Sequence, residues 1–209
     1  KLLTALVVLD NADLNDRICV SAHASMTEPT RAGLKAGVTY TVRDLLEALI
    51  ASSANDAGVA LAEGIAGSEE RFAELMNNKA RALGARDSHF TNATGLPDTR
   101  MLTTPYDFSI ITREAFSQPF IAGTMRQPSV TIRGSDGKTI TRKNHNKFLR
   151  RVDYPQILLK TGYTRSARHC YAGIAYYKDY RVSFVLFKSR KPWDDIARIL
   201  NIKVKKKRK

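Results

Sequence analysis

The sequence contains few residues of the two types that form disulfide frameworks and metal sites. Its two cysteines, Cys19 and Cys170, lie far apart in the chain, and no Cys-x-x-Cys pair occurs. Two cysteines do not make a disulfide framework, so we expect two separate buried thiols; a single bridge in an oxidising compartment stays open as the alternative. The histidines lack metal-ligand spacing, which predicts no zinc site: they are His23, His89, His145 and His169.

A long hydrophobic run is also missing. No stretch reaches the roughly 20 apolar residues that a membrane-spanning helix needs, so we expect none. The run "LLTALVVL" at residues 2–9 is too short, and "DNADLNDR" follows it without a small-residue cleavage site, so we expect no signal peptide there. A chain of 209 residues with 43% hydrophobic content predicts one globular domain, or one domain with an inserted lobe.

Acidic residues are scarcer than basic ones, and the excess is partly local. The chain has 34 Lys and Arg against 20 Asp and Glu, a net charge of +14. The end, "IKVKKKRK", holds six of the basic residues, and without them 28 face 20, or +8. Such a tail favours a polyanionic partner or is simply a solvated chain end. Nucleic acid is not expected, because no base-reading motif or interleaving of aromatic and basic residues occurs.

Apolar periodicity predicts a helical first half. Residues 2–9 read as a buried helix, and the following thirty or so residues as turns with short strands. Residues 40–67 predict two helices broken at "SSAND", the first with a capping box at Thr41 and Asp44. Further helices are expected at 68–84, where Gly84 stops the helix, and from Thr104 onward, where Pro105 opens it.

The pattern changes to strands after Pro119. "SVTIRGSDGKTITR" alternates around a turn and predicts a hairpin, and "QILLKTGYT", "CYAGIAYY" and "RVSFVLF" predict three antiparallel strands. "KPWDDIARILNIK" predicts a closing helix. We therefore expect a domain at 1–201, with a helical lobe at about 40–120 beside a sheet lobe from 1–39 and about 121–201, and a basic tail at 202–209.

Three places carry polar groups that a core would not need. A lysine at a helix N-terminus, like Lys1, is pushed toward its neutral form; alternatively it is a charged chain end. Ser53 and Asn55 can converge in the break between two helices, or can cap the second helix. Lys160 stands before Thr161 and Gly162 on a strand that a ligand can approach closely, or it deters edge-to-edge aggregation.

Taken together, these places match one signature. Ser-x-x-Lys, Ser-x-Asn and Lys-Thr-Gly in this order are typical of the penicillin-recognising serine enzymes. Here the second and third motifs are "SAN" and "KTG", and Lys1 matches the lysine of the first. The nucleophilic serine would then lie three residues before Lys1, one helical turn away on the same face and outside the sequence given.

Longer blocks make the resemblance specific. The chain resembles the D-alanyl-D-alanine carboxypeptidases, the low-molecular-mass penicillin-binding proteins of peptidase family S11, from Lys1 to about Asn201. The resemblance implies an α/β (α+β) class with the β-lactamase/transpeptidase-like fold, an antiparallel sheet flanked by helices beside a helical lobe. The blocks that carry it are "YTVRDLLEALIASSANDAGVALAE", "MNNKARALGARDSHFTNATGLPD", "TTPYDFSIITREAF" and "LLKTGYT".

The resemblance also implies roles for four catalytic residues. Lys1 would deprotonate the serine for attack on the D-Ala-D-Ala peptide bond, because a hydroxyl is a poor nucleophile until a base takes its proton. Ser53 would relay a proton to the leaving D-alanine, and Asn55 would hold the substrate amide and Lys1. Lys160 would contact Ser53 and keep the site positive for a substrate with a free carboxylate.

Substrate contacts are expected from the strand and from two arginines. Thr161 would bind the terminal carboxylate, Gly162 would allow close approach, and the Tyr163 N–H would form the oxyanion hole with that of the missing serine. Arg168 stands where the family often has Gly, so either the turn differs or its cation contacts the carboxylate. Arg190, between the last strand and the last helix, is a second candidate for that contact.

The implied partners are a peptidoglycan pentapeptide and β-lactam antibiotics as covalent inhibitors, with no metal or cofactor and no nucleic acid. The site of action would be periplasmic or extracytoplasmic, with the tail as a candidate contact to an anionic membrane surface. A β-lactamase is a weaker alternative, because its deacylating glutamate would be Glu74 in "ELMNN", which reads as helix surface. D,D-endopeptidase or transpeptidase action, or a non-catalytic wall-peptide binder of this fold, stays open.

Overall fold

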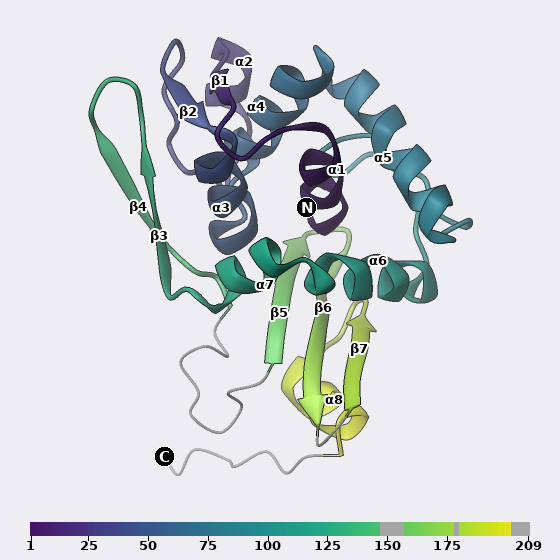
Figure 1. The fold of residues 1–209 in the computed structure, drawn as a ribbon. Coiled ribbons are helices and arrows are strands. Elements are labelled where there is room, and N and C mark those ends of the chain that lie inside the picture. The colour runs from purple at the N-terminus through teal and green to yellow at the C-terminus, as the bar shows by residue number, and fades with distance from the viewer. Residues whose placement is uncertain (147–156, 178–179, 202–209) are drawn as a thin grey trace.

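The computed structural model describes residues 1–146, 157–177 and 180–201. Helices make up most of its first half, and the strands of the main sheet follow late in the chain (Figure 1). The helices are α1 (Leu2–Asn11), α2 (Ala22–Met26), α3 (Val42–Ser52), α4 (Asn55–Ala66), α5 (Glu69–Leu83), α6 (Pro105–Ser117), α7 (Pro119–Arg126) and α8 (Pro192–Ile199). The strands are β1 (Arg17–Cys19), β2 (Thr39–Thr41), β3 (Ser129–Arg133), β4 (Thr139–Lys143), β5 (Ile157–Thr164), β6 (Arg168–Tyr177) and β7 (Tyr180–Leu186).

Helix α1 is central, as its apolar sequence predicts. Its residues from Leu2 to Val8 are all buried, and they pack in one core cluster with side chains of α3, α4, α5 and α6. A helix that is apolar on every side is stable only when other elements surround it. The first residue of the chain, Lys1, is therefore held at the edge of the core by the helix that follows it.

Helix boundaries follow the predicted caps. Thr41 accepts a hydrogen bond from the Asp44 N–H (3.1 Å), which confirms it as the expected N-cap; the Asp44 carboxylate accepts from the Thr41 hydroxyl (2.8 Å). Thr104 caps α6 by accepting from the Asp107 N–H. Gly84 ends α5 with a φ of 92°, a left-handed conformation that favours glycine.

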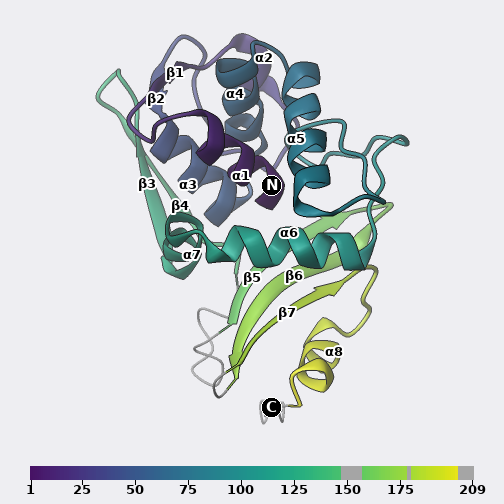
Figure 2. The ribbon, with the colours of Figure 1, turned by 45° about the vertical axis from the view of Figure 1, so that its right-hand side comes forward.

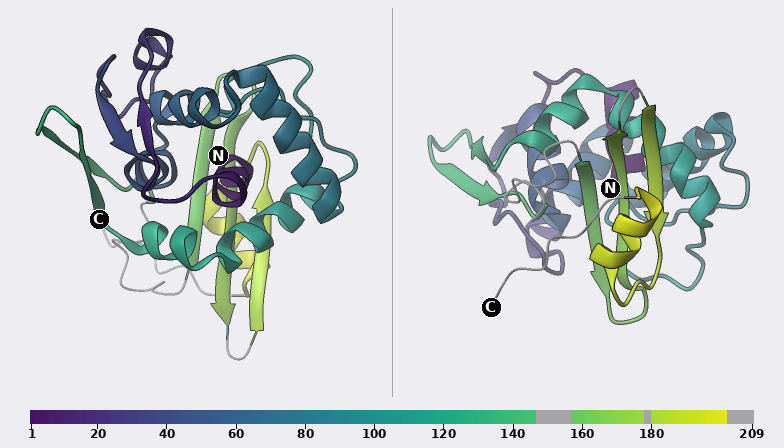
Figure 3. Two further views of the ribbon diagram at one scale, coloured as in Figure 1. Left: turned by 45° about the horizontal axis from the view of Figure 1, so that its top comes forward. Right: turned by 90° about the horizontal axis from the view of Figure 1, so that it is seen from below.

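The main sheet has the antiparallel order β5-β6-β7 and is covered by helices on both faces. Leu158, Ala172 and Ile174 point into the large core cluster that includes α6. Ile157, Leu159 and Phe184 point the other way and pack with Ile196 and Leu200 in the region of α8. Figures 2 and 3 show α6 and α8 on opposite sides of the three strands, so the expected helix-flanked sheet is confirmed.

Two further antiparallel pairs, β1-β2 and β3-β4, lie beside the helices. The predicted hairpin is the β3-β4 ribbon, which lies against α3 (Figure 1). Along β3, Val130 and Ile132 are buried and the alternate residues are exposed. Two short helices, α2 and α7, were not predicted. Helix α2 has only five residues, too few for a periodic apolar pattern, and α7 begins at Pro119, where the sequence indicates only a change of character.

The expected lobe boundaries do not coincide with separate cores. Side chains from 2–8, assigned to the sheet lobe in the sequence, join the same cluster as α3–α6, and so do three residues of the sheet. The division into lobes therefore stays a prediction. The basic tail at 202–209 and the last two residues of the expected closing helix lie outside the described residues. Within the described part, no helix is long and apolar enough to cross a membrane.

Candidate active site

A cavity of about 1010 Å³ lies where the ends of several helices meet strand β5. Eight of the nine residues proposed from the sequence line it: Lys1, Ser53, Asn55, Lys160, Thr161, Gly162, Tyr163 and Arg190. We call residues 160–163 of β5 the strand wall, and Lys1, Ser53 and Asn55 the helix-end wall. Residues that are 107 positions apart in the sequence, such as Ser53 and Lys160, thus face the same space.

A direct hydrogen bond joins the two walls. The Nζ atom of Lys160 donates to the Ser53 Oγ, and it also donates to the Thr161 carbonyl oxygen at 3.1 Å. Lys160 lies on an edge strand, as its alternative interpretation requires, but only 9% of it is exposed. A lysine that deters aggregation must reach solvent, so the burial of Lys160 favours a role inside the cavity.

Ser53 occupies a backbone conformation that non-glycine residues seldom adopt. Its φ of 58° and ψ of 33° place it in the left-handed region, immediately after the last residue of α3. This turn separates α3 from α4 and directs the hydroxyl toward Lys160 rather than along a helix. Ala54, not Ser53, is the N-cap of α4, so the capping alternative is not observed. Strained residues of this kind persist where the surrounding structure fixes them, often at functional sites.

Asn55 begins α4 and is almost completely buried, with 4% of it exposed. Its side-chain Nδ2 donates to the Glu28 carbonyl oxygen at 2.9 Å, and its backbone N–H donates to the Thr30 carbonyl oxygen at 2.7 Å. The resemblance implies that Asn55 also holds Lys1, but no hydrogen bond between these two residues occurs in the described part of the chain. In this structure, Asn55 is directed at the loop that contains Pro29 and Thr30, both of which line the cavity.

Lys1 is held by a different loop. Its Nζ donates to the Thr94 carbonyl oxygen, and Thr4, one turn later in α1, donates to the neighbouring Ala93 carbonyl oxygen at 2.7 Å. The start of α1 is therefore fixed against residues 93–94, in the segment that the sequence predicts only as a loop. This contact gives the Lys1 side chain a defined place at the cavity.

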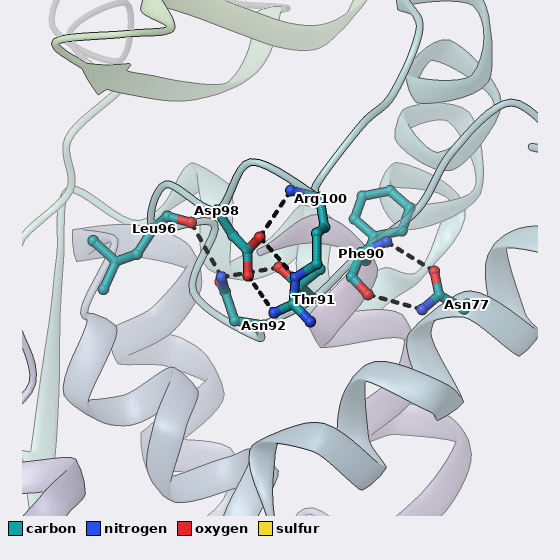
Figure 4. Close-up of polar contacts among 7 residues, drawn as sticks. All are labelled: Asn77, Phe90, Thr91, Asn92, Leu96, Asp98 and Arg100. Atoms are coloured by element: carbon teal, nitrogen blue, oxygen red, sulfur yellow. Dashed lines mark hydrogen bonds and ion pairs between the residues drawn. The ribbon is translucent and has the colours of Figure 1, made fainter.

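The loop around Thr94 is itself rigidly built (Figure 4). Asn77 of α5 exchanges two hydrogen bonds of 2.8 Å with the backbone of Phe90. The side-chain Oδ1 of Asn92 accepts from the Thr94 and Gly95 N–H groups, and its side-chain Nδ2 donates to the Leu96 carbonyl oxygen. A local network that uses both ends of an amide side chain defines the loop geometry. The position of the Thr94 carbonyl, and with it that of Lys1, follows from this network.

The electrostatics of the cavity favour neutral amines. Burial lowers the pKa of Lys1 to about 8. Burial, together with the charge of Lys1, lowers the pKa of Lys160 to about 7. The pKa of His145 is lowered by burial and by the same two lysines. Because desolvation and like charge both oppose the ammonium form, one of the two lysines can serve as a proton acceptor near neutral pH.

The two arginines are placed differently. Arg190 lines the cavity, near the start of α8. Arg168 begins β6 with a φ of 56°, so it adopts the left-handed conformation that a glycine would take without strain. Its side chain is exposed and is not among the residues that line the cavity. The structure gives no contact that supports Arg168 as a site residue.

Sequence reasoning missed several residues of the cavity wall, including Thr94, His145, His169 and Cys170. Their local sequences carry no motif, because each reaches the cavity only through long-range packing; the His145 N–H, for example, donates to the Ala51 carbonyl oxygen. The expectation of two buried thiols was wrong: both cysteines are free, but Cys19 is exposed and Cys170 is partly exposed in the cavity.

Two alternatives drawn from the sequence can also be compared with the structure. Glu74 is an exposed residue in the middle of α5, as the periodicity predicts, which leaves the β-lactamase interpretation without its glutamate. Among the described residues, no group of three or more His, Cys, Asp or Glu side chains is placed to hold a metal ion.

Comparisons with known proteins agree on one family. The family model described as D-alanyl-D-alanine carboxypeptidase (peptidase S11) matches residues 1–191. The chain is 30% identical over 205 residues to D-alanyl-D-alanine carboxypeptidase DacF of Bacillus subtilis, covering 95% of this chain and 52% of the relative. It is 36% identical over 178 residues to D-alanyl-D-alanine carboxypeptidase DacB2 of Mycobacterium tuberculosis, covering 84% and 60%. The chain thus spans between half and two thirds of the length of these curated relatives.

A solved structure gives the same result for the fold. The D-alanyl-D-alanine carboxypeptidase of Mycobacterium tuberculosis superimposes with a TM-score of 0.86 at 31% identity, covering 96% of this chain and 78% of that one. At this level of similarity the two chains share their overall architecture.

Proposed function

The chain belongs to peptidase family S11, the D-alanyl-D-alanine carboxypeptidases, and on this premise we propose that it is a serine-type D-Ala-D-Ala carboxypeptidase. Its substrates would be the stem peptides of peptidoglycan, and penicillins would acylate it. The observation that carries the proposal is the cavity in which Lys1, Ser53 and Asn55 face Lys160, with Lys160 donating directly to Ser53.

The proposed reaction begins with a serine three residues before Lys1. The neutral form of Lys1, which burial favours by lowering the pKa of the amine to about 8, would take the hydroxyl proton while the serine oxygen attacks the carbonyl carbon of the D-Ala-D-Ala bond. The C–N bond would then break, and Ser53 would relay a proton to the leaving amine of D-alanine while its own proton is replaced through the hydrogen bond that Lys160 donates to it. Water would hydrolyse the ester that remains and regenerate the serine.

The strand wall would bind the substrate. β5 is an edge strand of the described sheet, so half of its backbone N–H and C=O groups point away from β6. The Tyr163 N–H would stabilise the oxyanion, a contribution of roughly 3 kcal/mol per donor. Thr161 and Arg190 would bind the terminal carboxylate, and Gly162 leaves room for the peptide to approach the strand. Asn55 would contribute to holding the substrate amide.

The test is the intact mass of the protein before and after exposure to benzylpenicillin, on a chain extended at its N-terminus to include the motif serine. We expect a gain of one penicilloyl group that maps to this serine and that is lost in the Lys1→Ala variant. Release of D-alanine from a pentapeptide would then identify the reaction. An unchanged mass, with the serine confirmed in place, would contradict the proposal.

With a peptidoglycan substrate, the enzyme would act outside the cytoplasmic membrane. We propose in addition that the basic tail at 203–209 holds the enzyme at an anionic membrane surface, where each basic residue contributes roughly 1 kcal/mol. The chain with this segment deleted should bind less to liposomes that contain anionic lipid, and both chains should bind equally to neutral liposomes. Equal binding to the anionic liposomes would remove the membrane role.

A further inference from the structure

A buried carboxylate lies next to the site and has no part in the proposed reaction. Asp56 follows Asn55 in the first turn of α4, and none of its surface is exposed. A carboxylate in such a place needs hydrogen-bond donors, because burying it without partners costs several kcal/mol. Its hydrogen bonds come from backbone N–H groups and not from a cationic side chain.

Three of these donors belong to one loop. The N–H groups of Ala32 (2.8 Å), Gly33 (2.8 Å) and Leu34 (3.0 Å) all donate to the Asp56 carboxylate. The fourth donor is the N–H of the following residue, Ala57, at 3.0 Å. Four donors match the acceptor capacity of an ionised carboxylate. The loop is therefore attached to the N-terminal turn of α4 at three consecutive residues.

The same loop forms part of the cavity and contacts the motif asparagine. Pro29 and Thr30 line the cavity, and the carbonyl oxygens of Glu28 and Thr30 accept both hydrogen bonds donated by Asn55. Two adjacent residues of α4, Asn55 and Asp56, thus form hydrogen bonds with two different parts of the 28–34 loop. Asn55 is oriented by the first part of the loop, while Asp56 fixes the second part.

We infer that Asp56 is a positioning residue for acylation: it holds the 28–34 loop against α4 and thereby fixes the Asn55 amide and the Pro29–Thr30 wall of the cavity. The inference rests on the proposed function. Any buried carboxylate that holds a loop to a helix stabilises the fold. A positioning role therefore requires that loss of Asp56 lowers the acylation rate as well as the stability.

The chain offers a matched control in Asp107. This carboxylate also lies in the first turn of a helix, α6, and is 2% exposed. It accepts from the Asp87 N–H (2.8 Å) and the Ser88 hydroxyl (2.7 Å), and so holds a loop in the same way. None of these three residues lines the cavity. Asp107→Asn therefore reports the cost of weakening such a contact away from the site.

The first measurement compares the rate of benzylpenicillin acylation of Asp56→Asn and Asp107→Asn, on the chain that includes the motif serine and at a temperature where both are folded. In Asp56→Asn an amide N–H₂ faces backbone donors, and the loop must move. We expect acylation to fall about 10- to 100-fold, the effect of a displacement of roughly 1 Å at a reacting site. Asp107→Asn should acylate at the unaltered rate while losing thermal stability.

The second measurement needs no acylation and uses the 209-residue chain itself. Hydrogen exchange should become about tenfold faster or more at the Ala32, Gly33, Leu34 and Asn55 amides of Asp56→Asn, and not in Asp107→Asn. If Asp56→Asn does not fold, Asp56→Ser with Asp107→Ser takes its place, since serine keeps an acceptor at the helix start.

The outcomes separate the two proposals. An unaltered chain that is not acylated would overturn the proposed function and this inference with it. An unaltered chain that is acylated, with equal acylation rates in Asp56→Asn and Asp107→Asn, would overturn only the positioning role. Uniformly faster exchange across the whole of Asp56→Asn would also overturn it, because the loss would then be one of global stability.

Discussion

The strand wall and the helix-end wall face the same cavity, but different kinds of interaction hold them in place. Lys160, Thr161, Gly162 and Tyr163 are positioned by the regular pairing of β5 with β6, in which Lys160 pairs with Ala172 and Tyr163 with His169. The helix-end wall has no such repeat. Its residues are placed by single hydrogen bonds to loops, such as that from Lys1 to the Thr94 carbonyl.

This difference predicts how each wall responds to mutation. A strand distributes its stability over many equivalent backbone hydrogen bonds, so the loss of one side chain leaves the others in position. The helix-end wall depends on polar side chains that act at one place each, the half-buried Asn77 and Asn92 and the buried Asp56. We therefore expect mutations at the helix-end wall to lower stability and acylation rate together. Mutations in the strand wall should change one of these quantities without the other.

The largest effect is expected for the base. In the chain that includes the motif serine, Lys1→Ala should slow acylation by benzylpenicillin about 1000-fold, because proton transfer by a positioned base contributes roughly 10²- to 10⁴-fold. The control is Lys79→Ala, which removes a half-buried lysine outside the cavity wall that pairs with Asp10 at 2.8 Å, and it should not change the rate. The measurement is the acylation rate constant. A Lys1→Ala variant that acylates like the unaltered chain would exclude Lys1 as the base.

Ser53 allows backbone strain to be separated from chemistry. Both Ser53→Ala and Ser53→Gly remove the hydroxyl that accepts from Lys160, so both should slow acylation about 100-fold. Glycine also relieves the left-handed φ of 58°. We therefore expect Ser53→Gly to be more stable than Ser53→Ala by about 1 kcal/mol, or about 2–4 °C in Tm. Equal Tm values in thermal unfolding would show that the turn stores no strain.

The pH dependence of the reaction tests the electrostatics of the helix-end wall. Lys1, with its pKa lowered to about 8 by burial, is mostly protonated at pH 7 and mostly neutral at pH 9. Acylation should therefore rise about tenfold between these pH values, as the fraction of neutral base increases. A rate that does not change over this range would mean that another group takes the proton.

The pH dependence of stability tests the strand wall. The pKa of Lys160 is lower in the folded chain, about 7, than its ordinary value of 10.5. Between these values the unfolded chain binds more protons, so the free energy of unfolding rises with pH across this window. Removing the amine in Lys160→Met should reduce that rise by on the order of 1 kcal/mol per pH unit. Denaturant unfolding at pH 7, 8.5 and 10 measures it, and parallel curves for the two chains would contradict the prediction.

The smallest effect is expected at the cysteines. Cys170 pairs with Gly162 in the sheet and lines the cavity, whereas Cys19 is exposed on β1. Alkylation of the Cys19→Ser variant, which leaves Cys170 as the only thiol, should slow acylation severalfold, because the added group occupies space in front of the strand wall. Alkylation of Cys170→Ser should have no effect. Equal rates for the two alkylated variants would place Cys170 away from the bound substrate.

Much of the fold could be predicted from local patterns. The helices with strong apolar periodicity, their caps at Thr41 and Thr104, and the three strands of the main sheet all occur where they were expected. The short helices α2 and α7 were missed, because the five residues of α2 give too little periodicity to separate a helix from a turn and α7 begins at Pro119, directly after the end of α6 at Ser117. The prediction that both cysteines are buried was wrong, since the side of a strand on which a residue lies depends on the register of the strand.

The site shows the same division. The sequence by itself determined the residue types and their order, from Lys1 through "SAN" to "KTG", and the element on which each one lies. Only the tertiary structure decided that Asn55 is directed at the 28–34 loop, that Lys1 contacts Thr94 and that Arg168 lies outside the cavity wall. Local patterns report propensity and periodicity, which act over a few residues. The hydrogen bonds that assemble this cavity join residues 27, 93 and 107 positions apart, and only the packed core brings those residues together.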